Sequence, residues 1–305
     1  MIFSSTVPSA FRNAVPLIDY LAGRFTYHGR DAWRTVIRGG KISCNGRVAH
    51  ADDTVSAGDA VSYDPGEFEE PAADLSYRIC YEDEWLLGID KPGNLLVHRA
   101  GRSFRNNLIY QLRYVHVPPY PMAHAVHRLD RETSGVVCVA KTAGIKAVLG
   151  REFTEGKVKK VYYAVVRGAP EVREIDFPIG KTADSAIPYK HGVDPGGKAA
   201  VTRVIETRSV GNNHALVTLQ PLTGRTHQIR IHLAAIGTPI VGDRLYGLSE
   251  EAYLARRGSP SEPLRDRQAL HCASLSFIHP CTKQSCRIEA EMPDDMNELI
   301  RRLSK

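Results

Sequence analysis

An aspartate two positions after an arginine is the feature of this sequence with the clearest chemical potential. Both lie in residues 127–135, His-Arg-Leu-Asp-Arg-Glu-Thr-Ser-Gly, between two apolar runs. In an extended segment the side chains of Arg128 and Asp130 share one face, because successive side chains alternate. That face would carry a carboxylate beside a guanidinium. We interpret the segment as a turn at the edge of a packed sheet, where catalytic groups are often displayed.

Two other segments place polar residues on apolar elements and could complete a site with Asp130. A strand predicted over residues 158–166 contains Tyr162. Thr226 is the predicted cap of a helix that contains Arg230. Polar groups on an apolar scaffold are what a buried active site needs.

The elements that must position these residues favour an α+β fold, because the predicted strands outnumber the helices and do not alternate with them. We expect a central, mostly antiparallel sheet flanked by helices. Further strands are predicted within 77–90 and over 136–140, 199–207, 214–220, 270–277 and 285–291, and further helices over 107–114 and 142–153. Residues 180–198 are predicted to be a mobile basic loop, and 247–268 a charged surface insert with a helix.

Residues 12–64 form a separate predicted module, followed by a Pro-rich acidic linker at 65–76 and a large domain at 77–305. The module has two predicted helices and then an Asn45-Gly46 hairpin, the strongest short hairpin signal. Its second helix carries arginines at i, i+4 and i+8, which line one face. The basic residues that we predict to bind RNA are Arg30, Arg34, Arg38, Lys41 and Arg47.

This module resembles the S4 RNA-binding domain. The resemblance covers about 50 residues and rests on a basic second helix, the Asn-Gly hairpin and a late Gly-Asp before the final strand. It implies that the arginine row binds RNA, whereas without it the row would be an ordinary solvated helix face.

Charge and cysteine content are compatible with a nucleic-acid partner in a reducing compartment. The net charge is +6, with six Lys and Arg against one acid from Arg24 to Arg47, and eight acids with no Lys or Arg from Val48 to Ser76. The six cysteines form no Cys-x-x-Cys pair, and no apolar run reaches the ~18 residues of a membrane span. We expect a cytoplasmic protein without a membrane partner.

The large domain resembles the RluA family of pseudouridine synthases over roughly residues 77–292. The resemblance is carried by residues 127–135, the Lys-x-Tyr-x-Ala strand at 160–164, Thr-Gly-Arg-Thr-His-Gln-Ile-Arg-Ile-His at 223–232 and Gly-x-Pro-Ile-x-Gly-Asp-x-x-Tyr-Gly at 237–247. It implies an isomerase that cuts the uracil N1–C1′ bond, turns the base and rejoins it through C5. It implies neither a metal nor an organic cofactor, because substrate and product stay on the same RNA.

The resemblance also implies roles for individual residues. Asp130 would be the essential ionised carboxylate, acting by covalent attack or by removing a C2′ proton through a glycal. Arg230 would be its cation, and Tyr162 would stack on the target base and assist proton transfer at C5. Arg128 would fill the space left by the flipped uridine. Two apolar residues, Ile229 and Leu233, are candidates for the wall of the pocket.

Several alternatives stay open at this stage. The S4-like module favours large-subunit ribosomal RNA as the target, but tRNA is an alternative, as is a non-catalytic RNA-binding factor in ribosome assembly. The segment before the motif, Tyr-Pro-Met-Ala-His-Ala at 120–125, differs from the Arg-Pro-Gly type of segment that we expect there in many relatives. Four histidines could suggest a metal site, but their spacing fits no standard zinc motif, so we interpret them as structural: His124, His127, His227 and His232. We expect a monomer.

Overall fold

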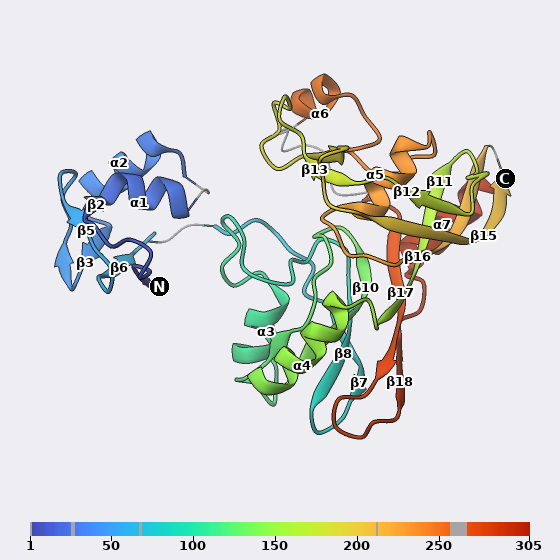
Figure 1. Cartoon of the computed structure of the whole chain (residues 1–305), viewed down its shortest axis with the longest axis horizontal. Coiled ribbons are helices and arrows are strands. Elements are labelled where there is room, and N and C mark those ends of the chain that lie inside the picture. The colour runs from blue at the N-terminus through green and yellow to red at the C-terminus, as the bar shows by residue number, and fades with distance from the viewer. Residues whose placement is uncertain (1, 26–27, 67–68, 212, 257–266) are drawn as a thin grey trace. The chain divides into compact units, whose positions relative to one another are not determined.

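The computed structural model forms two compact units, one of residues 1–71 with 100–104 and the other of 72–99 with 105–305 (Figure 1). It describes all residues except 1, 26–27, 67–68, 212 and 257–266. Part of the charged insert at 247–268 therefore lies outside the described residues. Within the described chain, no helix is both long and apolar enough to cross a bilayer.

Unit 1 is a pair of helices beside a small antiparallel sheet. Its elements are β1 (Phe3–Thr6), β2 (Val15–Pro16), α1 (Leu17–Arg24), α2 (Arg30–Arg38), β3 (Ile42–Cys44), β4 (Arg47–Val48), β5 (Thr54–Val55) and β6 (Ala60–Tyr63). The main sheet has the order β1-β6-β3-β4, and β2 pairs with β5. Leu17, Tyr20 and Trp33 are buried between the layers.

The predicted hairpin of unit 1 is confirmed. Asn45 and Gly46 have φ values of 51° and 80°, the left-handed conformations that a two-residue turn of this kind requires. The Asn45 side chain also accepts a hydrogen bond from the Ala60 backbone N–H at 2.8 Å. The turn is thereby tied to β6.

Unit 2 is built on a ten-stranded, mostly antiparallel sheet, so the expected α+β class is confirmed (Figure 1). Its strands are β7 (Arg78–Glu82), β8 (Leu86–Lys91), β9 (His124–Ala125), β10 (Ser134–Ala140), β11 (Lys159–Arg167), β12 (Glu174–Asp176), β15 (Val201–Gly211), β16 (His214–Pro221), β17 (Leu270–Ile278) and β18 (Ser285–Glu289). The order is β12-β15-β16-β11-β17-β10-β8-β7, with β18 on β17 and β9 on β10. The pairing of β10 with β17 is parallel.

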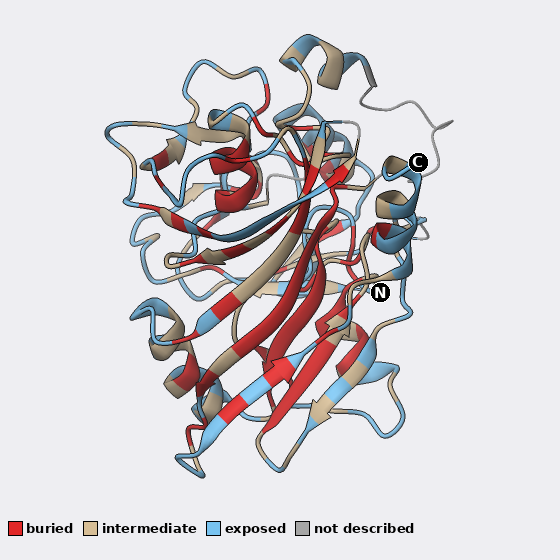
Figure 2. Ribbon diagram, turned by 90° about the vertical axis from the view of Figure 1, so that its right-hand side faces the viewer, coloured by how far each residue is buried: buried red, intermediate tan, exposed pale blue. Residues whose placement is uncertain are grey.

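The helices of unit 2 are α3 (Leu108–Tyr114), α4 (Ala143–Thr154), α5 (Gln228–Ala235), α6 (Glu250–Arg256) and α7 (Asp294–Leu303). Asn107 and Thr142 cap α3 and α4 through their side chains. Two apolar cores form, one around β8 and β10 and one around β11, β16 and α5. Tyr162 packs against both, and Figure 2 shows buried residues along the central strands.

Three sequence expectations differ from the structure of unit 2. Residues 180–198 are not a plain loop, because β13 (Ile179–Lys181) pairs with β14 (His191–Val193). Thr226 does not cap α5: the cap position is His227, which makes no capping hydrogen bond with its side chain. The helix α7 was not predicted, although the terminal segment was included in the domain.

Candidate active site

The loop that carries Asp130 joins β9 to β10 and is fastened to β17. The Gln268 side chain donates to Thr133 Oγ1 at 2.6 Å, and Ser134 Oγ lies 2.9 Å from His271 Nδ1. Gly135 has φ +105°, and a Cβ there would lie 2.1 Å from the carbonyl oxygen of Cys272. Thr133 and Ser134 therefore do more than shape a turn, and the close approach at position 135 requires glycine.

A buried lysine fixes the same loop from the opposite strand. Lys91 is fully buried, and its ammonium donates to the carbonyl oxygens of Pro92, Leu95 and Arg131 at 2.8, 2.9 and 3.3 Å. Burial lowers the pKa of Lys91 to about 7. Lys91 thus has a physical role, which is to hold the backbone next to Asp130.

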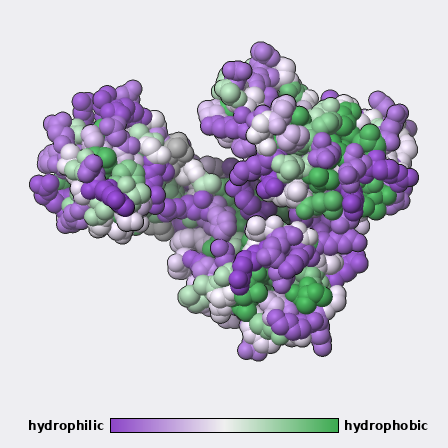
Figure 3. All heavy atoms as spheres, viewed as in Figure 1, coloured by the Kyte–Doolittle hydropathy of each residue, from purple (hydrophilic) through white to green (hydrophobic). Residues whose placement is uncertain are grey.

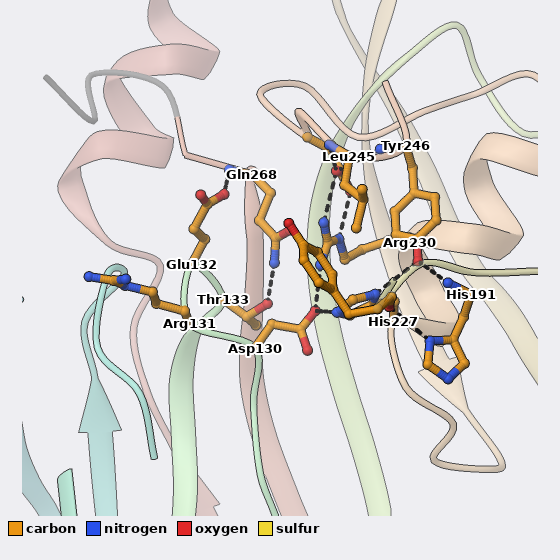
Figure 4. Close-up of polar contacts among 12 residues, drawn as sticks. Asp130, Arg131, Glu132, Thr133, His191, His227, Arg230, Leu245, Tyr246 and Gln268 are labelled. Atoms are coloured by element: carbon orange, nitrogen blue, oxygen red, sulfur yellow. Dashed lines mark hydrogen bonds and ion pairs between the residues drawn. The ribbon is translucent and has the colours of Figure 1, made fainter. Parts of the chain in front are cut away.

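Arg230 bridges two carboxylates, as Figure 4 shows in part. Its Nη1 donates to Asp130 Oδ2 at 2.8 Å, while Nε and Nη2 donate to the two oxygens of Asp243 at 2.7 and 2.9 Å. Asp243 also accepts from the backbone N–H groups of Leu245 and Tyr246. The predicted pairing of Asp130 with Arg230 is therefore present, and Asp243 holds the guanidinium in place.

The electrostatics keep Asp130 ionised. Burial by itself would raise the pKa of Asp130, but the neighbouring His227 and Arg230 more than offset it and lower the pKa below its ordinary value. Burial also lowers the pKa of His227 to about 4. Because His227 is then neutral at neutral pH, Arg230 is the permanent cation beside the carboxylate.

A cavity of about 580 Å³ opens beside Asp130, within the range of small-ligand pockets. Its walls come from the 126–133 loop, the end of α4, β11, residues 221–230 and Leu270. Tyr162, Ile229 and the exposed Arg128 all line it. Burial raises the pKa of Tyr162 well above its usual value, so its phenol stays protonated.

Leu233 is the one candidate wall residue that the structure moves elsewhere. It is fully buried and does not line the cavity, because it lies one helical turn beyond Ile229 and packs into the second apolar core. Apolar spacing alone cannot distinguish a pocket wall from the core beneath it.

The histidines separate into different environments. His127 Nε2 accepts from the Cys138 backbone, and His232 contacts Thr202 and the Phe177 carbonyl. Those two are structural, but His227 lines the cavity with Nε2 3.8 Å from Asp130 Oδ2. In the described part of the chain no group of three or more His, Cys, Asp or Glu could hold a metal.

Sequence reasoning assigned no role to Asp243, Tyr246 or Gln268. Asp243 and Tyr246 lie in the Gly-Asp-x-x-Tyr-Gly part of the motif at 237–247, and Gln268 begins the segment Gln-Ala-Leu-His at 268–271. The polar residues in these segments could have indicated a role, because a carboxylate and a tyrosine that become buried need hydrogen-bond partners.

The five basic residues predicted to bind RNA lie in unit 1 and are exposed. Arg30 pairs with Asp19, and Arg34 and Arg47 pair with Asp31 and Asp53 at 3.2 and 3.7 Å. Arg30, Arg34 and Arg38 lie on α2, and much of the visible surface of unit 1 is hydrophilic (Figure 3). The three arginines therefore lie on one helix at the spacing that the sequence predicted.

Comparisons with known proteins identify the family to which the chain is similar. A family model for RNA pseudouridylate synthase matches residues 86–235. The ribosomal large subunit pseudouridine synthase D of Pseudomonas aeruginosa is 35% identical over 93% of this chain and 90% of its own length. An uncharacterised RNA pseudouridine synthase of Bacillus subtilis is 36% identical over 86% of this chain and 90% of its own.

A solved structure gives the same result for the fold and the family. Human RNA pseudouridylate synthase domain containing 1 has a TM-score of 0.56 and 26% identity, and the match covers 77% of this chain and 97% of that one. The family model matches the segment that contains Asp130, Tyr162 and Arg230, and the sequence relatives match most of the chain. This protein therefore belongs to the RNA pseudouridylate synthase family.

Proposed function

We propose that this protein isomerises specific uridines of large-subunit ribosomal RNA to pseudouridine, with Asp130 as the essential carboxylate. The observation that carries the assignment of Asp130 is its ion pair with Arg230 at the wall of the cavity. A carboxylate in such a place is reactive only while ionised, and His227 and Arg230 together lower its pKa against the effect of burial. The Asp130 side chain is 20% exposed, so a substrate can reach it.

The reaction needs this ionised state by either chemical route. In one, the Asp130 carboxylate attacks the nucleoside and is later released; in the other, it removes a C2′ proton to give a glycal. Both routes break the N1–C1′ bond, with its electron pair leaving on the uracil, and both form a C5–C1′ bond after the base turns. The C5 proton is then lost to solvent and N1 takes up a proton, and on the glycal route the proton removed from C2′ is returned to C2′ as the C5–C1′ bond forms.

Tyr162 and Arg128 are suited to holding the flipped nucleotide. The aromatic ring of Tyr162 offers a stacking surface in the cavity, and its phenol stays neutral. We assign Tyr162 to base stacking with help in proton transfer at C5. We assign Arg128, an exposed residue of the same wall, to the space that the base leaves in the RNA.

Ribosomal RNA is favoured as the target by two features. Relatives that resemble this chain over most of its length carry the name ribosomal large subunit pseudouridine synthase D. Unit 1 has the helix pair, hairpin and basic row expected of an S4-like RNA-binding domain, for which we propose Arg30, Arg34, Arg38, Lys41 and Arg47 as contacts. We further propose that the protein acts as a monomer in the cytoplasm, where its six free cysteines would stay reduced.

The test of Asp130 is release of tritium from large-subunit ribosomal RNA transcribed with 5-tritiated uridine. We expect release by the wild type and none by Asp130→Asn, which keeps the shape of the side chain and removes its charge. Asp176→Asn, the same change on the exposed edge strand β12, is the matched control and should release tritium normally. Equal release by Asp130→Asn and the wild type would overturn the assignment.

The test of the target is to map pseudouridine by carbodiimide primer extension in wild-type and deletion strains. Loss of a modification from large-subunit RNA supports the proposal. Loss from tRNA alone would mean that tRNA is the target, with the proposed reaction unchanged. No loss from any RNA would favour an RNA-binding protein without this activity.

A further inference from the structure

His227 has a strained backbone at the edge of the catalytic cavity. Its φ and ψ are 56° and 19°, the left-handed conformation, at the cap position of α5. For a residue other than glycine this conformation costs roughly 1–2 kcal/mol, and such strain is concentrated at functional sites. The result is that the imidazole lines the cavity beside Asp130, with its side chain 14% exposed.

Tyr246 holds the imidazole from behind. The Tyr246 hydroxyl lies 2.8 Å from His227 Nδ1 and accepts a hydrogen bond from the His191 backbone N–H at 3.4 Å. The Arg230 guanidinium lies 5.0 Å from the centre of the Tyr246 ring, so the arginine that pairs with Asp130 also packs on this tyrosine. Figure 4 shows His191, Tyr246 and His227 in sequence, ending beside Asp130.

These contacts favour one tautomer of His227. The Tyr246 hydroxyl accepts from the His191 backbone N–H and carries one proton, which it can donate to His227 Nδ1. A neutral imidazole that accepts at Nδ1 carries its proton on Nε2. The Asp130 carboxylate, 3.8 Å from Nε2, favours the same tautomer, because a lone pair there would face a negative charge.

Among the described residues, no acceptor lies within hydrogen-bonding distance of the Nε2–H group. A separation of 3.8 Å is too long for a hydrogen bond, and none of the described residues accepts one from Nε2. Asp130 Oδ2 already accepts from Arg230. The structure therefore holds a neutral donor at the cavity wall next to the reacting carboxylate.

We propose that His227 Nε2–H donates a hydrogen bond to a carbonyl oxygen of the flipped uracil. This inference rests on the proposed function. When the N1–C1′ bond breaks, its electron pair leaves with the base, and the negative charge is shared by the two carbonyl oxygens. His227 keeps its proton throughout. A fixed donor aimed at an oxygen that gains charge stabilises the transition state more than the bound substrate.

The first test separates this role from a structural one by comparing His227→Phe and His227→Gln under single-turnover conditions. The substrate is an RNA fragment containing the uridine identified by mapping. We expect His227→Phe, which keeps a flat ring, to lower the rate by about 100-fold, the scale of losing one such donor. His227→Gln retains an N–H donor and should recover part of that loss, while RNA affinity stays within about twofold in both.

The second test replaces each uracil oxygen in turn, using fragments with 2-thiouridine or 4-thiouridine at the target. Sulfur accepts hydrogen bonds poorly, so at the contacted position the wild type should slow and His227→Phe should show little further loss. The same rate penalty from both sulfur substitutions in His227→Phe and in the wild type would overturn the proposal. So would an unchanged rate for His227→Phe on ordinary uridine.

Tyr246→Phe tests the tautomer directly. Nitrogen-15 shifts of the His227 ring should report a proton on Nε2 in the wild type and a mixture of tautomers in Tyr246→Phe. A wild-type proton on Nδ1 would overturn the assigned donor. If the wild type itself fails to convert ordinary uridine, the proposed function fails; if the wild type converts it and His227→Phe matches its rate, only this inference fails.

Discussion

Arginines in α5 and α2 have opposite surroundings, although each forms an ion pair. The Arg230 side chain is 9% exposed and contacts Asp130 and the 1% exposed Asp243. The Arg34 side chain is 49% exposed, and its partner Asp31 is 94% exposed. In the interior, the fixed guanidinium of Arg230 interacts strongly with Asp130 and helps to lower its pKa. At the surface, water screens the ion pair of Arg34, so this cation stays available to a polyanion.

The largest effect should come from Arg230→Gln. This change leaves two buried carboxylates without their cation, so we expect a loss of about 3–5 kcal/mol in the free energy of unfolding. Tritium release should fall by about 100-fold or more, because the pKa of Asp130 would rise. Arg34→Gln is the matched control and should cost at most about 0.5 kcal/mol. Denaturant unfolding would measure both variants. Equal losses in the free energy of unfolding would contradict the difference between the buried and the exposed arginine.

Glycine substitutions contrast the same two regions through the backbone. Gly135→Ala would place a Cβ against the Cys272 carbonyl at a positive φ, so we expect a loss of roughly 3 kcal/mol together with reduced activity. Gly23→Ala in α1 meets nothing within 4 Å and should stabilise the protein by up to about 1 kcal/mol. Thermal unfolding would measure both, and a tolerated alanine at position 135 would show that the loop has room to move.

Protonation of buried histidines should make stability depend on pH. Burial lowers the pKa of His127 to about 3 and that of His227 to about 4, whereas the unfolded chain takes up these protons near pH 6.5. The unfolded state therefore binds more protons below that pH, and the free energy of unfolding should decrease as pH falls, by up to about 1.4 kcal/mol per pH unit for each histidine.

His227→Gln should flatten this dependence between about pH 6.5 and 4.5, where the unfolded histidines titrate and ordinary carboxyl groups remain mostly ionised. Urea unfolding at several pH values would measure the slope. A slope identical to that of the wild type would mean that His227 takes up its proton at the same pH in the folded and unfolded states.

The smallest effect on folding but a clear effect on RNA binding should follow from Arg34→Glu with Arg38→Glu. Both residues are exposed, so stability should change little, while RNA affinity should weaken and its salt dependence should flatten by about 0.7–0.9 in log–log slope per lost phosphate contact. Arg301→Glu with Arg302→Glu, exposed residues at the end of α7, is the matched control. An unchanged slope for the α2 variant would reduce its arginines to ordinary surface charges.

Sequence reasoning reached the local elements more readily than the contacts between distant segments. The Asn45-Gly46 turn and the helix predicted over 142–153 follow from residues within a few positions of one another. The pair of Asp130 with Arg230 spans 100 positions and was expected only from a family resemblance. No periodicity encodes such a contact, because it depends on how strands are ordered in the sheet.

The start of α5 shows the same limit at short range. Thr226 has the side chain of a helix cap, but Gln228 fastens this segment, accepting from Thr223 and the Arg225 backbone and donating to Val201. This arrangement is compatible with the left-handed backbone of His227. His227, which the sequence analysis interprets as structural, thereby lines the cavity. Its position depends on the contact between Gln228 and Val201 of the distant strand β15, which the local sequence does not show.

The central claim is that Arg230 keeps Asp130 ionised, and the most direct measurement is a carbon-13 NMR titration of the Asp130 carboxyl. In the wild type we expect it to titrate below the ordinary aspartate value of about 3.9. In Arg230→Gln, where burial and the charge of Asp243 remain, it should titrate above that value. A wild-type Asp130 that titrates above the ordinary value, or that does not respond to loss of Arg230, would contradict the account.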